Sequence, residues 1–145
     1  MSDAPALSIR TATADDLKFV RGSWFESFKQ GGYAPQVAFP VYREGQDAII
    51  ERCLAAGRTL VAFSTAVPDE VCSWLCVEGA RLHYVYTKLV YRRHGIALQL
   101  VYASNFNVIS EHTHDTRVGR SFTARIGTKF NPYPLYHLAP RSTRR

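Results

Sequence analysis

The feature of this sequence that most constrains its fold is a series of three apolar, β-rich runs separated only by short turns. The runs cover residues 59–64, 70–77 and 82–90, and turn-forming residues lie between them at Pro68 and Gly79. Runs of this length that are rich in β-branched and aromatic residues predict strands. Because short connections join strands that lie side by side and antiparallel, the three runs predict a meander within a sheet.

One strand and one helix are predicted near the start of the chain. Residues 7–11 alternate apolar and polar side chains, which is typical of a short strand. Thr13 followed by Asp16 indicates a helix N-cap with an acidic first turn. The helix extends to about Lys29, before two glycines that begin at Gly31. Its apolar stripe consists of Leu17, Val20, Trp24 and Phe28.

A second helix directly precedes the meander. It is predicted to begin near Pro40 or Gln46 and to end at Ala56, because Gly57 stands where helices commonly end. Both starts stay open, since Gly45 weakens the first turn. The residues predicted to face inward are Ile49, Ile50, Cys53 and Leu54.

The last third of the chain predicts further helices and strands. Residues 96–108 predict a helix with Leu100 and Val101 facing inward, and residues 109–113 predict a strand. Residues 130–138 contain two prolines, so they predict a broken edge strand.

One more helix is predicted between these two strands. Asp115 or Thr116 caps it and Gly127 ends it. Its apolar residues at four-residue steps are Val118, Phe122 and Ile126. The complete order of elements predicts an α/β (α+β) fold, with a mixed, mostly antiparallel sheet of about six strands and about four helices on its faces.

Length and composition indicate one globular domain. The chain has 145 residues, of which 46% are hydrophobic and 21% charged, as is usual for a single core. We expect this domain to span residues 1–140 and residues 141–145 to form a basic disordered tail. Nothing resembles a signal peptide or reaches the length of a membrane span. We therefore expect a soluble, cytoplasmic protein with no membrane contact.

Cysteine usage fits the same compartment. The three cysteines, Cys53, Cys72 and Cys76, lack a paired, metal-type spacing. We expect them to be small buried apolar residues in a reducing environment.

Positive charge is concentrated in the second half of the chain. The net charge is +6, but residues 1–80 hold 7 Lys or Arg against 10 Asp or Glu, whereas residues 81–145 hold 11 against 2. A phosphate-bearing cofactor, a nucleic acid and a merely solvated surface are all consistent with this asymmetry.

The passage from the meander into the next helix carries the strongest functional signal. Arg92 and Arg93 come just before Gly95 and Ala97, where the helix begins. The first amides of a helix have no partner within it, and the helix dipole adds a partial positive charge. Gly95 permits a tight turn, and Ala97 leaves room for a phosphate beside the backbone. The junction therefore predicts an anion site suited to a pyrophosphate.

This junction resembles the signature of the GNAT superfamily of acyl-CoA-dependent N-acyltransferases. The signature is Gln or Arg, two variable residues, Gly, one variable residue, then Gly or Ala, placed after the fourth strand and opening the third helix. Arg92, Gly95 and Ala97 match it in the expected place, within an order of elements that agrees over most of residues 7–138. The resemblance implies a GNAT-like fold and transfer of an acetyl group from acetyl-CoA to an amine of a small molecule or protein.

The resemblance also implies where acetyl-CoA binds as cosubstrate. Backbone amides from Arg93 to Ala97 would bind the pyrophosphate, and the strand end near Thr87 would offer main-chain hydrogen bonds to the pantetheine arm. The cofactor-binding residues so implied are Val85, Tyr86, Thr87, Arg92, Arg93, His94, Gly95, Ile96 and Ala97. The alternative is a plain strand-to-helix turn without a ligand.

Two residues are candidates for the catalytic base. The superfamily often places this base on the fourth strand, where His83 lies, and an unperturbed histidine titrates at about 6.5. Glu78 is the second candidate, and a purely structural role is the alternative for each. Alternation along the strand predicts His83 on the same face as Val85 and opposite Tyr84.

The sequence departs from the superfamily pattern at the general acid. This acid is frequently a Tyr in the fourth helix, but the matching helix here offers Ser121, Phe122 and Thr123. Tyr133 or Tyr136 are possible substitutes that no pattern fixes. The resemblance therefore leaves the acid open.

Aromatic and histidine side chains are the candidates for binding the amine substrate. They are Trp24, Tyr33, His112 and His114. Most aromatic residues of a helical stripe belong to the core, whereas Tyr33 lies beside two glycines in a predicted loop. His112 and His114 share one face of their predicted strand, which suits a polar pair lining a cleft. No third ligand has a recognisable spacing, so we expect no metal.

A protein without catalysis is the main alternative function. In this interpretation the chain is a catalytically inactive GNAT-fold binding module that acts by protein contact. A further resemblance to small GNAT-like proteins of phages and prophages rests on Ser23 and Trp24, the HYVY run and residues 131–135. The basic half lacks a recognised nucleic-acid motif, so we expect no nucleic-acid partner. We expect a monomer or homodimer.

Overall fold

The structure is a computed structural model that describes residues 7–31, 39–66, 70–92, 94–104, 109–114 and 119–131. Its elements are β1 (Leu7–Thr11), α1 (Ala14–Gly31), α2 (Phe39–Ala56), β2 (Arg58–Ser64), β3 (Val71–Glu78), β4 (Arg81–Thr87), α3 (Ile96–Ala103), β5 (Glu111–His112), α4 (Arg120–Ile126) and β6 (Lys129–Phe130).

The described strands form one sheet in the order β1 to β6. Neighbours from β1 to β4 are antiparallel, whereas β5 is parallel to both β4 and β6. This arrangement confirms the predicted meander and the predicted mixed, mostly antiparallel sheet. It also makes β4 the strand at which the antiparallel part of the sheet meets the parallel part.

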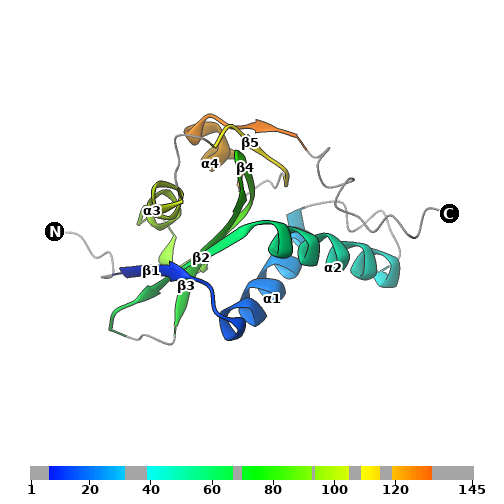
Figure 1. The fold of residues 1–145 in the computed structure, drawn as a ribbon, viewed down its shortest axis with the longest axis horizontal. Coiled ribbons are helices and arrows are strands. Elements are labelled where there is room, and N and C mark those ends of the chain that lie inside the picture. The colour runs from blue at the N-terminus through cyan, green and yellow to red at the C-terminus, as the bar shows by residue number, and fades with distance from the viewer. Residues whose placement is uncertain are drawn as a thin grey trace.

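Helices cover both faces of the sheet (Figure 1), so its central strands are buried on both sides. On one face, α1 and α2 pack against β3 and β4; this core contains Val20, Trp24, Phe25, Ile50, Cys53, Trp74, Cys76 and Tyr84. On the other face, α3 provides the main cover and α4 packs at its side; this core contains Leu60, Leu75, Val77, Leu82, Ile96, Leu100 and Val101. The inward-facing residues predicted for α2 and α3 therefore face inward as expected.

The start of α1 has the predicted cap. The Thr13 hydroxyl accepts a hydrogen bond from the Asp16 amide at 3.3 Å, and the Asp16 carboxylate accepts one from the Thr13 amide at 2.8 Å. Arg10 of β1 forms an ion pair with the same carboxylate. Burial alone would raise the pKa of Asp16, but hydrogen bonds from Arg10 and Thr13 bring it below its usual value.

Several predicted boundaries are wrong. The first helix continues through Gly31, the helix predicted over residues 96–108 ends at Ala103, and the strand predicted over residues 109–113 covers only residues 111–112. The strand predicted over residues 82–90 ends at Thr87, because Tyr91 N–H bonds to the Lys88 carbonyl at 2.9 Å and begins a 3₁₀ turn. The last helix begins at Arg120 with Gly119 at its N-cap, and its first backbone bond runs from Thr123 N–H to the Gly119 carbonyl at 3.0 Å. The predicted caps at residues 115 and 116 lie outside the described residues.

The three cysteines are buried and unpaired, as predicted. Burial raises the pKa of the Cys53 thiol, and it raises the pKa of Cys76 to about 12. These thiols are therefore protonated and unreactive at neutral pH.

No helix in the described part of the chain is long and apolar enough to cross a bilayer.

Candidate functional site

The most distinctive feature of the sheet is that β4 has strand partners on both sides only at its beginning. β5 pairs with β4 at Arg81 and Leu82, and Thr113 N–H adds a last bond to the Leu82 carbonyl at 3.1 Å. Beyond Leu82 the β5 side of β4 has no strand partner among the described residues, whereas β3 stays paired with it as far as Thr87. We call this place, where β4 and β5 part, the fork.

Main-chain groups of β4 point into the fork. Lys88 N–H bonds to the Cys72 carbonyl on the β3 side at 2.9 Å, and the Tyr86 carbonyl accepts a bond from the Ser73 hydroxyl at 2.7 Å. Because backbone groups alternate sides along a strand, those of Val85 and Thr87 point the opposite way. This unpaired edge can receive an extended, amide-containing ligand.

The unpaired edge leads into the turn that opens α3. Gly95 is the N-cap of α3 and has φ of +74°, a left-handed conformation that glycine adopts without strain. No side chain caps the first turn of α3, and that turn holds no acidic residue. A Cβ placed on Gly95 would meet no atom within 4 Å, so the described residues leave the space beside it open.

The remaining residues of the turn have different surroundings. Arg92 donates from Nε to the Thr87 carbonyl at 2.9 Å, which ties the turn to the end of β4. His94 and Ala97 are partly exposed, whereas the Ile96 side chain is 2% exposed within the core, so only its main chain can contact a ligand. Arg93 lies outside the described residues.

A β-bulge at His83 changes the directions of side chains on β4. Cys76 pairs with Tyr84, but the next residue of β3, Val77, pairs with Leu82, so His83 is the extra residue. Leu82 consequently packs in the α3 core, whereas Tyr84 packs in the α1 and α2 core. The simple alternation predicted along β4 therefore breaks between Leu82 and Tyr84.

His83 lies in a chain of four hydrogen-bonded side chains, Glu78, His83, Thr113 and His114, which we call the polar chain. His83 Nε2 lies 2.9 Å from Glu78 Oε1, and His83 Nδ1 lies 2.8 Å from the Thr113 hydroxyl. The same hydroxyl lies 3.1 Å from His114 Nδ1. His83, Thr113 and His114 are buried, and the Glu78 side chain is 28% exposed.

Both nitrogens of His83 are therefore already hydrogen-bonded, and its side chain is closed to direct contact with a substrate. Burial lowers the pKa of His83, while the hydrogen bond and charge of Glu78 act in the opposite direction. Burial and the nearby His83 lower the pKa of His114 to about 3. Both lowered pKa values favour neutral histidines at neutral pH.

Trp24 belongs to an aromatic stack beside the fork. Its ring lies parallel to that of Tyr84, with centroids 5.3 Å apart, and meets the His114 ring edge-on at 5.2 Å. Trp24 is fully buried, and its Nε1 has no hydrogen-bond partner among the described residues. By contrast, Trp74 donates from Nε1 to the Ser23 hydroxyl at 2.8 Å. Contact of Trp24 with a substrate stays a prediction.

The two histidines predicted to form one polar pair have separate surroundings. His112 ends β5, where its Nδ1 lies 2.8 Å from the Thr128 hydroxyl and its ring packs near Phe130. His114 lies past the strand, in the polar chain. Among the residues described, no group of His, Cys, Asp or Glu side chains could hold a metal ion. Tyr33 is outside the described residues.

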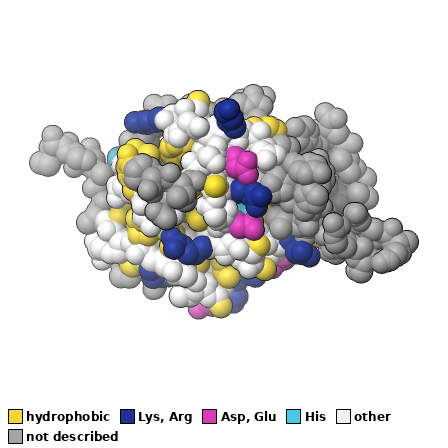
Figure 2. Space-filling model, turned by 45° about the horizontal axis from the view of Figure 1, so that its top comes forward, with side chains coloured by type: hydrophobic (Ala, Val, Ile, Leu, Met, Phe, Trp, Pro, Cys, Tyr) yellow, Lys and Arg dark blue, Asp and Glu magenta, His cyan; other side chains and the backbone are white. Residues whose placement is uncertain are grey.

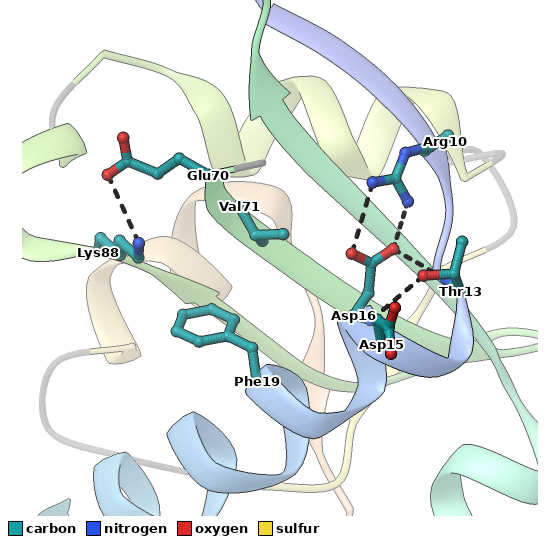
Figure 3. Close-up of a pocket in the computed structure, with 8 residues that line it drawn as sticks. All are labelled: Arg10, Thr13, Asp15, Asp16, Phe19, Glu70, Val71 and Lys88. Carbon is teal, nitrogen blue, oxygen red and sulfur yellow. Dashed lines mark hydrogen bonds and ion pairs between the residues drawn. The ribbon is translucent and has the colours of Figure 1, made fainter. Parts of the chain in front are cut away.

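A hollow of about 410 Å³ lies beside the start of α1 (Figure 3). Four of its charged side chains pair with one another, since Asp16 pairs with Arg10 and Lys88 Nζ lies 3.5 Å from Glu70. The lining residues are Arg10, Thr13, Asp15, Asp16, Phe19, Glu70, Val71 and Lys88. None of the predicted site residues that the structure describes lines this hollow.

The surface near the open end of the polar chain carries paired charges. Arg81 Nε lies 3.0 Å from Glu111, and another nitrogen of Arg81 lies 4.0 Å from Glu78. Hydrogen bonds from Asn131 and then Arg81 lower the pKa of Glu111. Figure 2 shows acidic and basic side chains side by side on one face of the molecule. Glu78 thus meets solvent beside Arg81, which also pairs with Glu111.

Sequence reasoning missed Thr113. It stands between two histidines in a short polar run, but only the bulge and the parallel pairing of β5 with β4 bring its hydroxyl to His83. Nothing in the spacing of the sequence could have found this contact.

Solved structures of known proteins share this fold. A GCN5-related N-acetyltransferase from Ralstonia eutropha JMP134 superposes with a TM-score of 0.65, at 14% identity over 87% of this chain and 94% of that one. A ribosomal-protein-alanine N-acetyltransferase from Brucella melitensis biovar Abortus 2308 gives 0.57, at 15% identity over 87% and 94%. The aminoglycoside N-acetyltransferase AAC(6')-Iy, solved with CoA, gives 0.51, at 15% identity over 89% and 91%.

No protein-family profile and no curated protein sequence matches the chain. The similarity to these proteins is therefore a similarity of fold. In each comparison it covers nearly the whole length of both chains. The chain has the fold of the GCN5-related N-acetyltransferases, the GNAT superfamily, as its sequence resemblance predicts.

Proposed function

We propose that the protein is an N-acetyltransferase that transfers the acetyl group of acetyl-CoA to an amine of a small molecule or protein. The observation that carries this proposal is the unpaired edge of β4, which runs directly into the left-handed turn at Gly95. An extended amide chain and a pyrophosphate are the two parts of CoA that need such surfaces.

The fit of acetyl-CoA to these residues rests on three observations. The edge offers the main-chain donor and acceptor of Val85 and the amide of Thr87 to the pantetheine arm, while the Thr87 carbonyl accepts its hydrogen bond from Arg92. The uncapped amides at the start of α3 can bind the pyrophosphate, since helix N-termini attract anions. The bare Gly95 leaves space for the phosphates to approach, with Arg92 nearby for charge.

The chemistry then requires the protein to orient the amine and to remove its proton. Acetyl-CoA supplies the acetyl group as an activated thioester. Glu78 and His83 are the proton acceptors in this proposal, acting together through their 2.9 Å hydrogen bond. Because His83 is buried, the proton reaches it through a neighbouring group rather than directly from the amine.

The proposal is tested by calorimetric titration with acetyl-CoA, followed by mass spectrometry of a panel of amines and peptides incubated with it. We expect saturable binding, and a thermal stabilisation equivalent to about 2.7 kcal/mol when acetyl-CoA is at one hundred times its Kd. Adenosine alone should stabilise far less, because it lacks the phosphates and the pantetheine. Absence of acetyl-CoA binding would contradict the proposal. Binding without acetylation of any amine would favour a GNAT-fold binding module.

A further inference from the structure

The polar chain connects the fork to the protein surface without interruption. At its inner end, His114 follows Thr113, where β5 leaves β4, and the His114 ring meets Trp24 and Tyr84 edge-on. At its outer end, Glu78 is 28% exposed beside Arg81. Two intermediate links, at 2.8 and 3.1 Å, meet at the Thr113 hydroxyl. Thr113 is therefore the only joint between the two ends among the hydrogen bonds described.

An ionised Glu78 fixes the direction of every hydrogen bond in the polar chain. A carboxylate only accepts, so Nε2 of His83 holds a proton and donates it. Nδ1 of neutral His83 then accepts from the Thr113 hydroxyl. The Thr113 oxygen in turn accepts from Nδ1–H of His114. His83 and His114 are thus opposite tautomers, Nε2–H and Nδ1–H.

The three hydrogen bonds that link these side chains also form after one proton has crossed the polar chain. When His114 gains a proton at Nε2, its Nδ1 proton passes to the Thr113 oxygen. The hydroxyl proton of Thr113 passes to Nδ1 of His83, and the Nε2 proton of His83 passes to Glu78. One bond to hydrogen forms for each that breaks. No heavy atom moves, because only the donor and acceptor roles are exchanged.

We propose that Thr113 is a positioning residue that joins His114 to His83 and Glu78, so that the proton released by the amine at the fork leaves through Glu78. The inference rests on the proposed acetyl transfer and adds the route of its proton. It also explains how a buried histidine with both nitrogens engaged serves as part of a base. His114 is the inner end of this route, and because it is buried as well, the proton reaches it through a group at the fork; Glu78 is the outer end, which returns the proton to solvent.

The arrangement of Glu78, His83 and the Thr113 hydroxyl also resembles a catalytic triad of carboxylate, histidine base and hydroxyl nucleophile. Two observations assign Thr113 to proton transfer instead. Thr113 is 1% exposed, which keeps a thioester from reaching its oxygen, and its hydroxyl is hydrogen-bonded to both His83 and His114. An acetylated Thr113 in a quenched reaction would overturn this assignment.

The experiment compares Thr113→Val with Thr113→Ser. Valine keeps the shape but removes the hydroxyl, whereas serine keeps the hydroxyl. We expect Thr113→Val to lower kcat about 10²-fold, at the low end of what general acid–base catalysis contributes, with little change in acetyl-CoA affinity. Thr113→Ser should restore most of kcat. Thr128→Val is the matched control, because it removes a hydroxyl from another 2.8 Å threonine–histidine contact outside the polar chain.

A solvent-isotope measurement separates proton relay from structural support. In mixtures of light and heavy water, kcat of the wild-type protein should depend on the deuterium fraction along a curve, because several protons move together. Thr113→Val should lose this curvature even where it folds normally. Equal kcat for Thr113→Val and wild type, or a straight dependence for wild type, would overturn the relay while leaving acetyl transfer intact.

Nitrogen-15 NMR of the histidines tests the hydrogen-bond directions without any activity. At neutral pH we expect neutral His83 with its proton on Nε2 and neutral His114 with its proton on Nδ1. The reverse tautomers would overturn the inference even in an active enzyme. Failure to bind acetyl-CoA would remove the proposed function, and with it the relay.

Discussion

The two halves of β4 present opposite surfaces, although they belong to one strand of seven residues. From Arg81 to Tyr84 the strand is paired or packed on every side, bulged at His83, and joined to its surroundings by side-chain hydrogen bonds. From Val85 to Thr87 it is regular, partly exposed and open along one edge. The half from Arg81 to Tyr84 is suited to chemistry by its side chains. The half from Val85 to Thr87 is suited to binding a ligand through its main chain.

Because the two halves of β4 differ in this way, we expect acetyl-CoA binding and proton transfer to be separable by mutation. Main-chain binding depends on backbone conformation, which a change at the turn disturbs while leaving the polar chain intact. Proton transfer depends on the identity of buried polar side chains, which can change without moving the edge of β4. Substitutions in the two halves should therefore alter different kinetic constants.

The largest effect is expected at the turn. Gly95→Val should bring acetyl-CoA binding below detection by calorimetry, because a β-branched residue at φ of +74° is strained and its side chain fills the space proposed for the phosphates. Gly127→Val is the matched control, since Gly127 has φ of +82° at the end of α4 and equally open surroundings. It should lose comparable stability yet bind acetyl-CoA. Equal affinities in the two variants would show that the turn is not the phosphate site.

The next effect is expected in the bulged half. His83→Gln and Glu78→Gln should each lower kcat by about 10²- to 10⁴-fold, the usual contribution of a general base, with the KM for acetyl-CoA nearly unchanged. Circular dichroism and thermal melts would establish that both variants fold. A variant with wild-type kcat would remove that residue from the base.

The pH dependence of the wild-type rate gives a related expectation. The rate should rise with pH as His83 loses its proton, at a pKa below the ordinary 6.5 because of burial. Glu78→Gln should move this rise to still lower pH, since the carboxylate acts to raise the pKa of His83. A rise moved to higher pH would contradict the described contact.

A smaller effect concerns stability in acid. The pKa of His114 falls from 6.5 unfolded to about 3 in the folded protein. Between these values the unfolded state binds more protons, so stability is complete above 6.5 and declines as pH falls. The melting temperature should therefore drop between pH 6.5 and 5, and His114→Phe should drop less. An unchanged drop in the variant would contradict the burial of a neutral His114.

The smallest effect is expected for Arg92, which links the turn to the strand. Arg92→Ala removes one hydrogen bond to the Thr87 carbonyl, of the kind that contributes about 0.5 to 1.5 kcal/mol. Acetyl-CoA affinity should fall up to about tenfold, with kcat unchanged. Loss of kcat without loss of affinity would mean that the two halves of β4 are not separable.

The regular half of the site could be predicted from the sequence, because its signals are local. Gly95 at a strand-to-helix junction required only neighbouring residues to be recognised, and its left-handed φ confirms the tight turn. The meander and the cap at Thr13 were predictable for the same reason.

The bulged half could not be predicted, because it depends on pairing between distant segments. Alternation along β4 failed at His83, where one extra residue redirects the strand. Thr113 reaches His83 only because β5 is parallel to β4, since the two residues are 30 positions apart in the sequence. Asp115 looked like a helix cap from its residue type, but the described helix begins with Gly119 at its N-cap.

The proposed acetyl-CoA site is tested most directly by mapping acetyl-CoA onto the backbone amides by NMR titration. We expect the largest shifts at the amides of Val85, Thr87 and Gly95 to Ala97, and small shifts at β1 and β2. We also expect CoA to give nearly the same map and adenosine not to. Shifts concentrated at the hollow beside α1, or none at saturating acetyl-CoA, would contradict the assignment of the fork and the turn as the acetyl-CoA site.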